Sequence, residues 1–376
     1  MTGFCLNNFD ETSFLKEHWQ KQPLLLNEAI ADFTSPISSD ELAGLALEEF
    51  IESRIIFLND DGEYDVLHGP FEAKDYQQLE GKQWTLLVQA VDHYVEEIEE
   101  LKSLFRFIPD WRLDDIMISF APTGGGVGPH FDQYDVFLLQ AQGKRLWKLG
   151  QHCDDNTPLA DNPDVQILES FETENEFVLE PGDVLYVPPG KAHWGLAETD
   201  DCITISIGFR APSLEELIAN LCDDVASRLP DSIRYQDNDL GAQAEGGHPT
   251  EITQATINRI KQVVAEQLLD DQRIAESFAG LMTQTKYGDL EADDEMTQVL
   301  RKNPESRMAY YVKDDNLMVF ANGYCSEITV NHLEFIQGIA DSHYVELDGL
   351  NDDQTAIVEE LFDLGFYLSC DADFGD

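Results

Sequence analysis

The sequence predicts an α+β protein built around a small open barrel or jelly roll. Residues 116–120 and 203–209 alternate apolar side chains on one face with polar side chains on the other, as the wall of a ligand-holding barrel does. Between these runs, other short apolar stretches are separated by Gly and Pro turns. Helical periodicity dominates residues 10–50 and the chain after residue 212. At 376 residues the chain is too long for one ordinary core, so we expect two or three domains.

The part of the chain before the barrel is predicted to hold helices and one hairpin. A first helix ends before Pro23, and a second begins near Ser39, where serines can cap it. Residues 53–60 and 64–68 predict a hairpin, because two strand-like runs flank an Asp-Asp-Gly turn. Residues 84–109 predict a long helix, since apolar positions recur there at intervals of three and four.

A potential metal site lies directly after the glycine-rich turn at residues 124–128. His130 and Asp132 are two positions apart, so in an extended chain both side chains emerge on one face. His193 is well placed to join them from another strand, because it follows a short apolar run and a Pro-Pro-Gly turn. Two histidines and one carboxylate leave three coordination positions open, as in non-haem Fe(II) oxygenases. The pattern therefore predicts an iron enzyme.

The charge balance constrains the partners. The chain carries 23 basic and 74 acidic residues, a formal net charge of −51. Such a surface repels phosphate backbones and attracts cationic molecules, so we expect a basic protein partner and no direct binding to nucleic acid. Two interpretations of the acidity stay open, namely solubility in a salt-adapted organism and electrostatic steering of a basic protein substrate.

Composition also predicts a cytoplasmic protein without a membrane segment. The sequence contains no run of 18 apolar residues, and its first residues have neither a basic region nor an apolar signal core. The six cysteines are scattered with no Cys-x-x-Cys spacing, as expected of reduced thiols.

Two motifs and their surroundings carry a family resemblance. Gly124, five residues and His130-x-Asp132, then Gly182, five residues and Pro188-x-Gly190-x-x-His193, resemble the two cupin motifs, with Asp132 in place of the usual second histidine. Together with FLKEHWQKQPLLL near the N-terminus and GVGPHFDQYDVFLLQAQGKRLWKLG around the first motif, they resemble the JmjC-type ribosomal oxygenases of bacteria. The resemblance covers roughly the first 212 residues, and the order of elements continues to the C-terminus.

The resemblance implies a cosubstrate and the residues that bind it. It implies Fe(II) held by His130, Asp132 and His193, with 2-oxoglutarate and O2 as cosubstrates. The far carboxylate of 2-oxoglutarate needs a cation, and an arginine serves best because its guanidinium forms bidentate pairs. Arg145 matches the family's arginine and shares its strand face with Trp147, whereas Lys144 lies on the other face. Ser119 matches a serine of the family that contacts 2-oxoglutarate.

The substrate is also given by the resemblance, which implies hydroxylation of an arginine side chain of large-subunit ribosomal protein L-sixteen. Gln133, Tyr134 and Asp135 directly follow the metal ligand and could contact that side chain, although packing within a strand explains them equally well. Hydroxylation of histidine or asparagine in another protein stays open. So does a function of a different class, an acidic dimeric cupin-like module that binds basic ribosomal proteins without turnover.

After residue 212 the pattern becomes helical. We expect three domains: a JmjC/cupin domain (1–212), a helical dimerisation region (213–284) and a winged-helix-like C-terminal domain (285–376). Apolar stripes on the helices are compatible with a homodimer, which the resemblance implies. The C-terminal part is predicted to contain a first helix soon after Tyr287, then a hairpin across Asp314 and Asp315, and two further helices. Residues 236–251 read as a polar linker.

Overall fold

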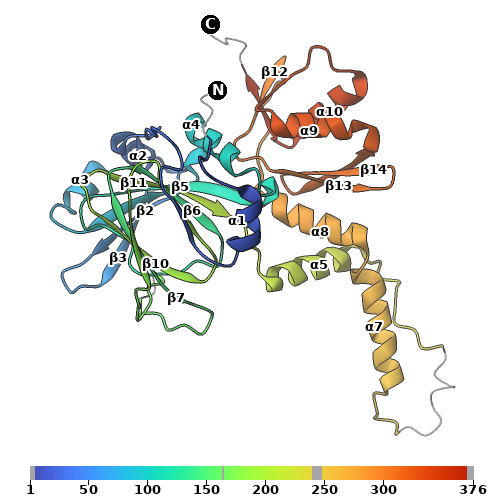
Figure 1. Ribbon diagram of the computed structural model, residues 1–376. Helices are drawn as coiled ribbons and strands as arrows, with labels where there is room; N and C mark the ends of the chain where they lie inside the picture. The colour runs from blue at the N-terminus through green and yellow to red at the C-terminus, as the bar shows by residue number, and fades with distance from the viewer. Residues whose placement is uncertain (1–4, 163–164, 239–247, 371–376) are drawn as a thin grey trace. The chain divides into compact units, whose positions relative to one another are not determined.

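The structure is a computed structural model that describes residues 5–162, 165–238 and 248–370. The chain divides into two compact units, Met1–Ala211 and Pro212–Asp376, and each is considered by itself (Figure 1). The predicted linker at residues 236–251 falls partly outside the described residues, since 239–247 are not among them. Within the described ranges, no helix combines the length and the apolar character that crossing a membrane requires.

Eight strands of the first unit form one antiparallel sheet in the order β1-β9-β6-β11-β5-β4-β2-β3. The strands are β1 Leu24–Leu26, β2 Ser53–Leu58, β3 Tyr64–His68, β4 Trp84–Val88, β5 Leu113–Ala121, β6 Val136–Gln142, β9 Val184–Val187 and β11 Cys202–Phe209. The β2–β3 hairpin predicted from the sequence is confirmed. β11 lies between β5 and β6, so segments far apart in the chain build the centre of the sheet.

A second, three-stranded antiparallel sheet has the order β10-β7-β8. Its strands are β7 Arg145–His152, β8 Asn175–Leu179 and β10 Lys191–Ala197. Buried apolar side chains from β6 and β9 of the large sheet and from β7 and β8 of the small sheet pack into one cluster, made of Val136, Leu138, Trp147, Leu149, Leu179, Leu185 and Val187. The two sheets therefore face each other, and the predicted jelly roll is confirmed.

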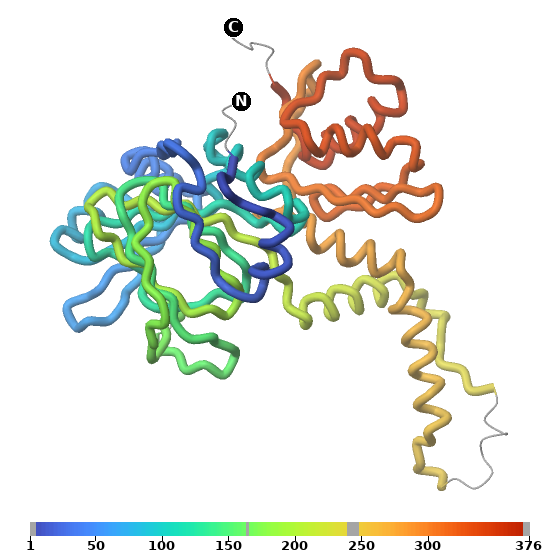
Figure 2. Tube along the Cα trace, in the orientation of Figure 1, coloured from blue at the N-terminus to red at the C-terminus, as the bar shows by residue number. Residues whose placement is uncertain are grey.

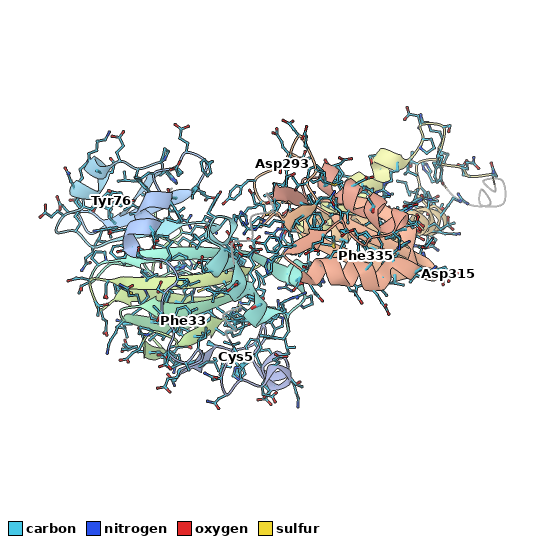
Figure 3. The ribbon with its side chains drawn as sticks, turned by 90° about the horizontal axis from the view of Figure 1, so that it is seen from above. Cys5, Phe33, Tyr76, Asp293, Asp315 and Phe335 are labelled. Atoms are coloured by element: carbon cyan, nitrogen blue, oxygen red, sulfur yellow. The ribbon has the colours of Figure 1, made fainter. Side chains whose placement is uncertain are left out.

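The other face of the large sheet carries the main core of this unit. The covering elements are α1 Glu11–Glu17, α2 Ser39–Leu45, α3 Ala73–Gln77, α4 Glu96–Glu99 and the 3₁₀ turns η1 Val91–His93, η2 Glu100–Phe105 and η3 Asp110–Arg112. Phe14 of α1 packs in this core with Ile118 of β5 and Ile205 of β11. Phe33, labelled in Figure 3, belongs to the same core. The predicted alternation of β5 and β11 is confirmed, because their isoleucines face this core and their polar residues face the inside of the jelly roll.

The helix predicted for residues 84–109 is wrong at its start. Trp84–Val88 is strand β4, paired with β2 on one side and β5 on the other, and short 3₁₀ and α-helical turns follow it. Residues 84–88 are a continuous apolar run, which fits a buried strand as well as a helix. Pairing with β2 on one side and with β5 on the other decides in favour of the strand.

The second unit contains the helices α5 Leu214–Arg228, α7 Gln254–Leu268 and α8 Asp271–Thr283, which lie in the region 213–284 that was predicted to be helical. Beyond them lie two three-stranded sheets, β13-β14-β15 and β16-β12-β17, with the helices α9 and α10. Their bounds are β12 Val299–Lys302, β13 Met308–Lys313, β14 Asn316–Ala321, β15 Tyr324–Thr329, η4 Val330–His332, α9 Leu333–Asp341, β16 Tyr344–Glu346, α10 Asp352–Asp363 and β17 Tyr367–Cys370.

The predicted β13–β14 hairpin and the last two helices are confirmed, and Figure 3 labels Asp315 at the hairpin turn. The helix predicted soon after Tyr287 is wrong, because residues 287–298 form irregular chain. That stretch contains several neighbouring carboxylates, whose mutual repulsion opposes helix formation.

Candidate metal centre

The structure brings His130, Asp132 and His193 together in the first unit. One ligand atom from each of the three residues lies within 4.8 Å of the others. Nε2 of His193 is 3.5 Å from a carboxylate oxygen of Asp132, and the two imidazole rings are 4.2 Å apart between centroids. Atoms at this spacing can reach one small cation together, and two nitrogens with one carboxylate match the donor set of a non-haem iron site.

Backbone pairing fixes the segment that carries His130 to the strand that carries His193. The two residues exchange both main-chain hydrogen bonds, with N···O distances of 3.1 and 2.8 Å. The carbonyl of Asp132 accepts a further hydrogen bond from the amide of Gly190 at 2.8 Å. The ligands of the two motifs are therefore positioned by the main chain, and their side chains only need to adopt suitable rotamers.

Both histidines present the same ring nitrogen to the centre. Nδ1 of His130 lies 3.0 Å from the carbonyl of Gly128, and Nδ1 of His193 lies 3.0 Å from the carbonyl of Lys191. A carbonyl only accepts, so these contacts favour the tautomer with hydrogen on Nδ1 and leave Nε2 as the electron-pair donor. Burial, with His130 adding to it, lowers the pKa of His193 to about 4. Its ring is therefore neutral at neutral pH, as metal binding requires.

The glycines before His130 are required by close packing against β10. The amide of Gly124 donates to the carbonyl of Ala197, and the amide of Ala197 donates to the carbonyl of Gly125. A Cβ on Gly126 would lie 2.3 Å from the carbonyl oxygen of Gly195, which no side chain can tolerate. Gly124 also has a positive φ of 83°, a conformation that favours glycine. The glycine-rich turn thus lets the ligand segment run directly beside β10.

Arg145 lies on the face of β7 that it shares with Trp147, which packs inside the jelly roll. It is 3% exposed, and its Nε and one terminal nitrogen have no hydrogen-bond partner among the residues that the structure describes. Its guanidinium carbon lies 5.8 Å from the ring centroid of Trp147, whose ring is 5.8 Å from that of His193. Lys144 instead pairs with Glu180 on the surface. Unpartnered donors on a buried cation fit an anion that the protein itself does not supply.

Ser119 belongs to a polar row that crosses the inner face of the large sheet. It stands opposite Thr204 in the β5–β11 pairing, and Thr204 stands opposite Gln140 in the β11–β6 pairing. All three are buried, and the hydroxyl of Thr204 donates to the side-chain oxygen of Gln140 at 3.0 Å. Gln140 was not singled out from the sequence, although it is an amide within the apolar run of β6, on the inward parity.

Gln133 and Tyr134 lie at the surface next to the ligands. Gln133 is exposed and donates a hydrogen bond of 3.3 Å to Asp155. Tyr134 is 42% exposed, and desolvation together with the carboxylates of Asp132 and Asp115 raises its pKa. Both side chains are accessible to a large substrate, and their contact with one stays a prediction.

Asp135 is not at the surface with Gln133 and Tyr134. Its side chain is fully buried, and its carboxylate accepts hydrogen bonds from Tyr186, Gln20 and Arg112. Side chains alternate along this part of the chain, and Val136 points into the jelly roll. Asp135 therefore points to the opposite side, toward the main core, in which Tyr186 also packs. The expectation that Asp135 meets the substrate does not fit this packing.

Two charged residues near Tyr134 were missed by sequence analysis. Asp115 is buried on β5 and accepts a hydrogen bond of 2.7 Å from Gln89. The positive charge of Arg54 on β2 lowers the pKa of Tyr134, whereas the carboxylate of Asp115 raises it. Neither residue occurs in a motif, and their proximity to Tyr134 arises only from strand order.

Comparisons with known proteins agree with this arrangement. A model of the JmjC domain matches residues 100–217. The chain is 40% identical over 280 residues to ribosomal protein uL16 3-hydroxylase of Escherichia coli, covering 73% of this chain and 71% of that protein. It is 31% identical over 368 residues to a probable ribosomal oxygenase of Haemophilus influenzae, covering 93% and 90% of the two chains.

Solved structures give the same result. The X-ray structure of E. coli ycfD matches with a TM-score of 0.84 and 33% identity over 97% of this chain and 99% of that chain. The structure of YcfD, a ribosomal oxygenase, in complex with cobalt and 2-oxoglutarate matches with a TM-score of 0.81 at the same identity, over 97% of this chain and 99% of that one. The JmjC/cupin fold is thereby confirmed, and the chain belongs to the family of JmjC-domain ribosomal oxygenases.

Proposed function

We propose that this protein is a 2-oxoglutarate- and Fe(II)-dependent protein hydroxylase that modifies an arginine side chain of ribosomal protein uL16. The observation that carries the proposal is the buried guanidinium of Arg145, in which Nε and one terminal nitrogen have no hydrogen-bond partner among the described residues, in the same jelly roll as the cluster of His130, Asp132 and His193. A metal-binding cupin without oxygenase activity has no need for a buried cation of this kind, since a buried unpaired charge destabilises the fold.

The donor set and its surroundings fit iron. His130, Asp132 and His193 would hold the ion and leave the remaining positions open to cosubstrates. When bound, the iron supplies the oxidation, in which 2-oxoglutarate and O2 give succinate and carbon dioxide and one oxygen atom enters a C–H bond of the substrate. The protein contributes neutral imidazoles of fixed tautomer and a ligand segment fixed by the main chain.

Arg145 would bind the far carboxylate of 2-oxoglutarate with its two free donor groups. Ser119, on the polar row of the facing sheet, offers a hydroxyl whose contact with the carbonyl of Thr204 is long at 3.5 Å, and it is therefore available as a second donor. The buried ring of Trp147 lies 5.8 Å from both the Arg145 guanidinium carbon and the His193 ring, and it would exclude water from the space that the cosubstrate's carbon chain would cross.

Three features support a cationic substrate. Exposed carboxylates lie next to the ligand segment after β7, where Asp155 accepts a hydrogen bond from Gln133 and Asp154 precedes it. Tyr134 and Gln133 offer an aromatic face and an amide beside the ligands, and the buried carboxylate of Asp115 lies close enough to shift the pKa of Tyr134. The relative in E. coli is named as a 3-hydroxylase of uL16, a ribosomal protein.

Mass spectrometry of ribosomal proteins incubated with the protein, Fe(II), 2-oxoglutarate and O2 tests the proposal. We expect a gain of one oxygen on an arginine of uL16 and no gain with the His130→Ala variant. Oxygen on a histidine or asparagine would transfer the activity to another substrate. Binding of ribosomal proteins without any oxidised peptide or succinate would replace the hydroxylase by a binding module.

We further propose that residues 213–284 mediate a homodimer and that residues 285–376 form a winged-helix-like domain that serves protein docking or structure. α5 and α7 carry exposed apolar side chains at helical spacing, which supports a helix-mediated interface: Leu214, Ile218, Ile257, Ile260, Val263 and Val264. The helices α9 and α10 against the strands β13–β15 support the winged-helix assignment. A ribosomal protein substrate supports a cytoplasmic location.

The dimer gives a direct prediction. Ile260→Glu places a charge within the apolar stripe of α7 and is expected to shift the sedimentation coefficient from dimer to monomer. Gln262→Glu adds the same charge two positions along the same helix, outside the stripe, and should leave the dimer intact. A wild-type protein that sediments as a monomer at micromolar concentration would contradict the proposal.

A further inference from the structure

The buried carboxylate of Asp135 joins the metal-ligand segment to the N-terminal part of the chain. One carboxylate oxygen accepts a hydrogen bond of 2.6 Å from the hydroxyl of Tyr186. The other accepts from the side-chain amide of Gln20 at 3.0 Å and from the guanidinium of Arg112 at 3.2 Å. We name these four residues the Asp135 cluster.

The partners come from three separate elements. Tyr186 lies on β9, Arg112 ends the turn η3, and Gln20 follows α1 in the N-terminal segment, dark blue in Figure 2. The hydroxyl of Tyr186 donates to Asp135 and at the same time accepts a hydrogen bond of 2.7 Å from the amide of Gln20. Burial raises the pKa of Tyr186, so its hydroxyl stays protonated and remains a donor. The hydrogen bonds from Tyr186, Gln20 and Arg112 therefore hold the Asp135 carboxylate in one orientation at a buried position.

Aromatic packing closes this cluster on the side of α1. The ring of Trp19 stacks on that of Tyr186 at 5.8 Å, and the guanidinium of Arg112 lies 5.5 Å from the Trp19 ring. Phe14 of α1 meets the Tyr186 ring edge-on at 4.9 Å. The N-terminal segment singled out in the sequence, residues 14–26, thus contacts Asp135 through Gln20 and packs Trp19 and Phe14 against the Tyr186 ring.

Asp135 is close to the metal ligands in the chain, so its hydrogen bonds bear on the position of the ligand segment. Asp135 is three residues after Asp132, and its carbonyl accepts a hydrogen bond of 3.1 Å from the amide of Phe209 on β11. At the other end of the segment, His130 is fixed by its two hydrogen bonds to His193. Between these points, the carbonyl of Asp132 accepts a hydrogen bond of 2.8 Å from the amide of Gly190, and residues 131–134 are otherwise only partly buried or exposed. The hydrogen bonds of His130 and Gly190 hold the first part of the segment, and those of Asp135 hold its end, so the direction of the Asp132 carboxylate depends on both.

We propose that Asp135 is a positioning residue for the metal site, which holds the Asp132 carboxylate at binding distance by fixing the end of the ligand segment to Tyr186, Gln20 and Arg112. This inference depends on the proposed function, because it assumes that the three ligands bind a metal. It also gives the N-terminal segment a role in metal affinity, although no residue of that segment is a ligand.

The test uses Mn(II) as the probe. The dissociation constant of Mn(II) is measured from the electron paramagnetic resonance signal of the free ion, and the melting temperature of the metal-free protein is measured alongside. Asp135→Asn keeps the shape of the side chain but replaces one acceptor oxygen by a donor group, which then faces hydroxyl or nitrogen donors. We expect a dissociation constant about 10-fold higher, the scale of effects seen for groups that orient metal ligands. Tyr186→Phe and Gln20→Ala should each cause a smaller increase.

Asp92→Asn is the matched control. Asp92 is also a buried carboxylate on the core face, where it accepts a hydrogen bond of 2.7 Å from the amide of Ile116 and pairs with Lys102. This variant should lower the melting temperature but leave the Mn(II) dissociation constant within about twofold.

The outcomes separate the two proposals. Wild-type protein that does not bind Mn(II) would contradict the proposed function itself. Wild-type protein that binds, with Asp135→Asn binding equally well or weakened no more than Asp92→Asn, would overturn the positioning role. If Asp135→Asn does not fold, the same comparison is made with Tyr186→Phe, which removes one hydrogen bond and leaves the aromatic packing in place.

Discussion

Asp132→Ala should abolish hydroxylation and lower metal affinity by at least about 100-fold, because even the partners that only orient metal ligands contribute 10- to 100-fold. Asp132 is the one carboxylate of the cluster, so the variant removes the negative charge that offsets the cation and leaves two neutral imidazoles. Succinate release under saturating 2-oxoglutarate, together with a Mn(II) binding titration, measures both effects.

Asp110→Ala serves as the control for this variant. Asp110 is an exposed carboxylate that pairs with Arg106 on the surface, remote in sequence from both motifs. Its removal should leave turnover and Mn(II) affinity unchanged. Retention of more than a tenth of wild-type turnover by Asp132→Ala would show that another group binds the metal.

Arg145→Met should impair catalysis and stabilise the metal-free protein at the same time. Losing a charge-assisted bidentate pair costs about 3 kcal/mol, and each 1.4 kcal/mol is about a factor of ten, so we expect the KM for 2-oxoglutarate to rise about 100-fold. Without cosubstrate, the same guanidinium is buried with unpartnered donors, and replacing it by an apolar side chain should raise the melting temperature. Opposite signs of the two effects are the mark of a ligand-binding residue.

Steady-state kinetics and differential scanning calorimetry measure these two quantities. Lys144→Met is the matched control, since Lys144 is the adjacent cation but pairs with Glu180 at the surface. It should change neither the KM for 2-oxoglutarate nor the melting temperature appreciably. An Arg145→Met variant that is destabilised and keeps its KM would assign Arg145 to the fold instead of the cosubstrate.

The parts of this site that follow from local geometry could be predicted from the sequence. His130 and Asp132 share a face because they are two positions apart in extended chain, and Arg145 was expected on the strand face of Trp147, opposite to that of Lys144. Arg145 and Trp147 are both buried, whereas Lys144 pairs with Glu180 at the surface. The turn motif before His193 placed this residue on a second strand, and the backbone pairing with His130 agrees with that placement.

The parts that depend on long-range pairing could not be predicted in this way. Adjacency in the sequence grouped Asp135 with Gln133 and Tyr134 without showing that β6 begins at Val136 and that Asp135 faces the core. Residues 84–88 form a strand only because β2 and β5 lie on either side of them. Asp115 and Gln140 became candidates only once strand order placed them inside the jelly roll or near Tyr134. Strand order comes from the whole fold, and no short motif encodes it.

The central claim is that His130, Asp132 and His193 bind iron while Arg145 positions 2-oxoglutarate against it. An anaerobic absorption titration tests this claim most directly, because a 2-oxo acid bound to Fe(II) produces a visible charge-transfer band. We predict that the band appears when wild-type protein receives Fe(II) and 2-oxoglutarate, is absent for Asp132→Ala, and requires far more 2-oxoglutarate for Arg145→Met. Wild-type protein that binds Fe(II) with no such band, or a band that persists in Asp132→Ala, would contradict the account.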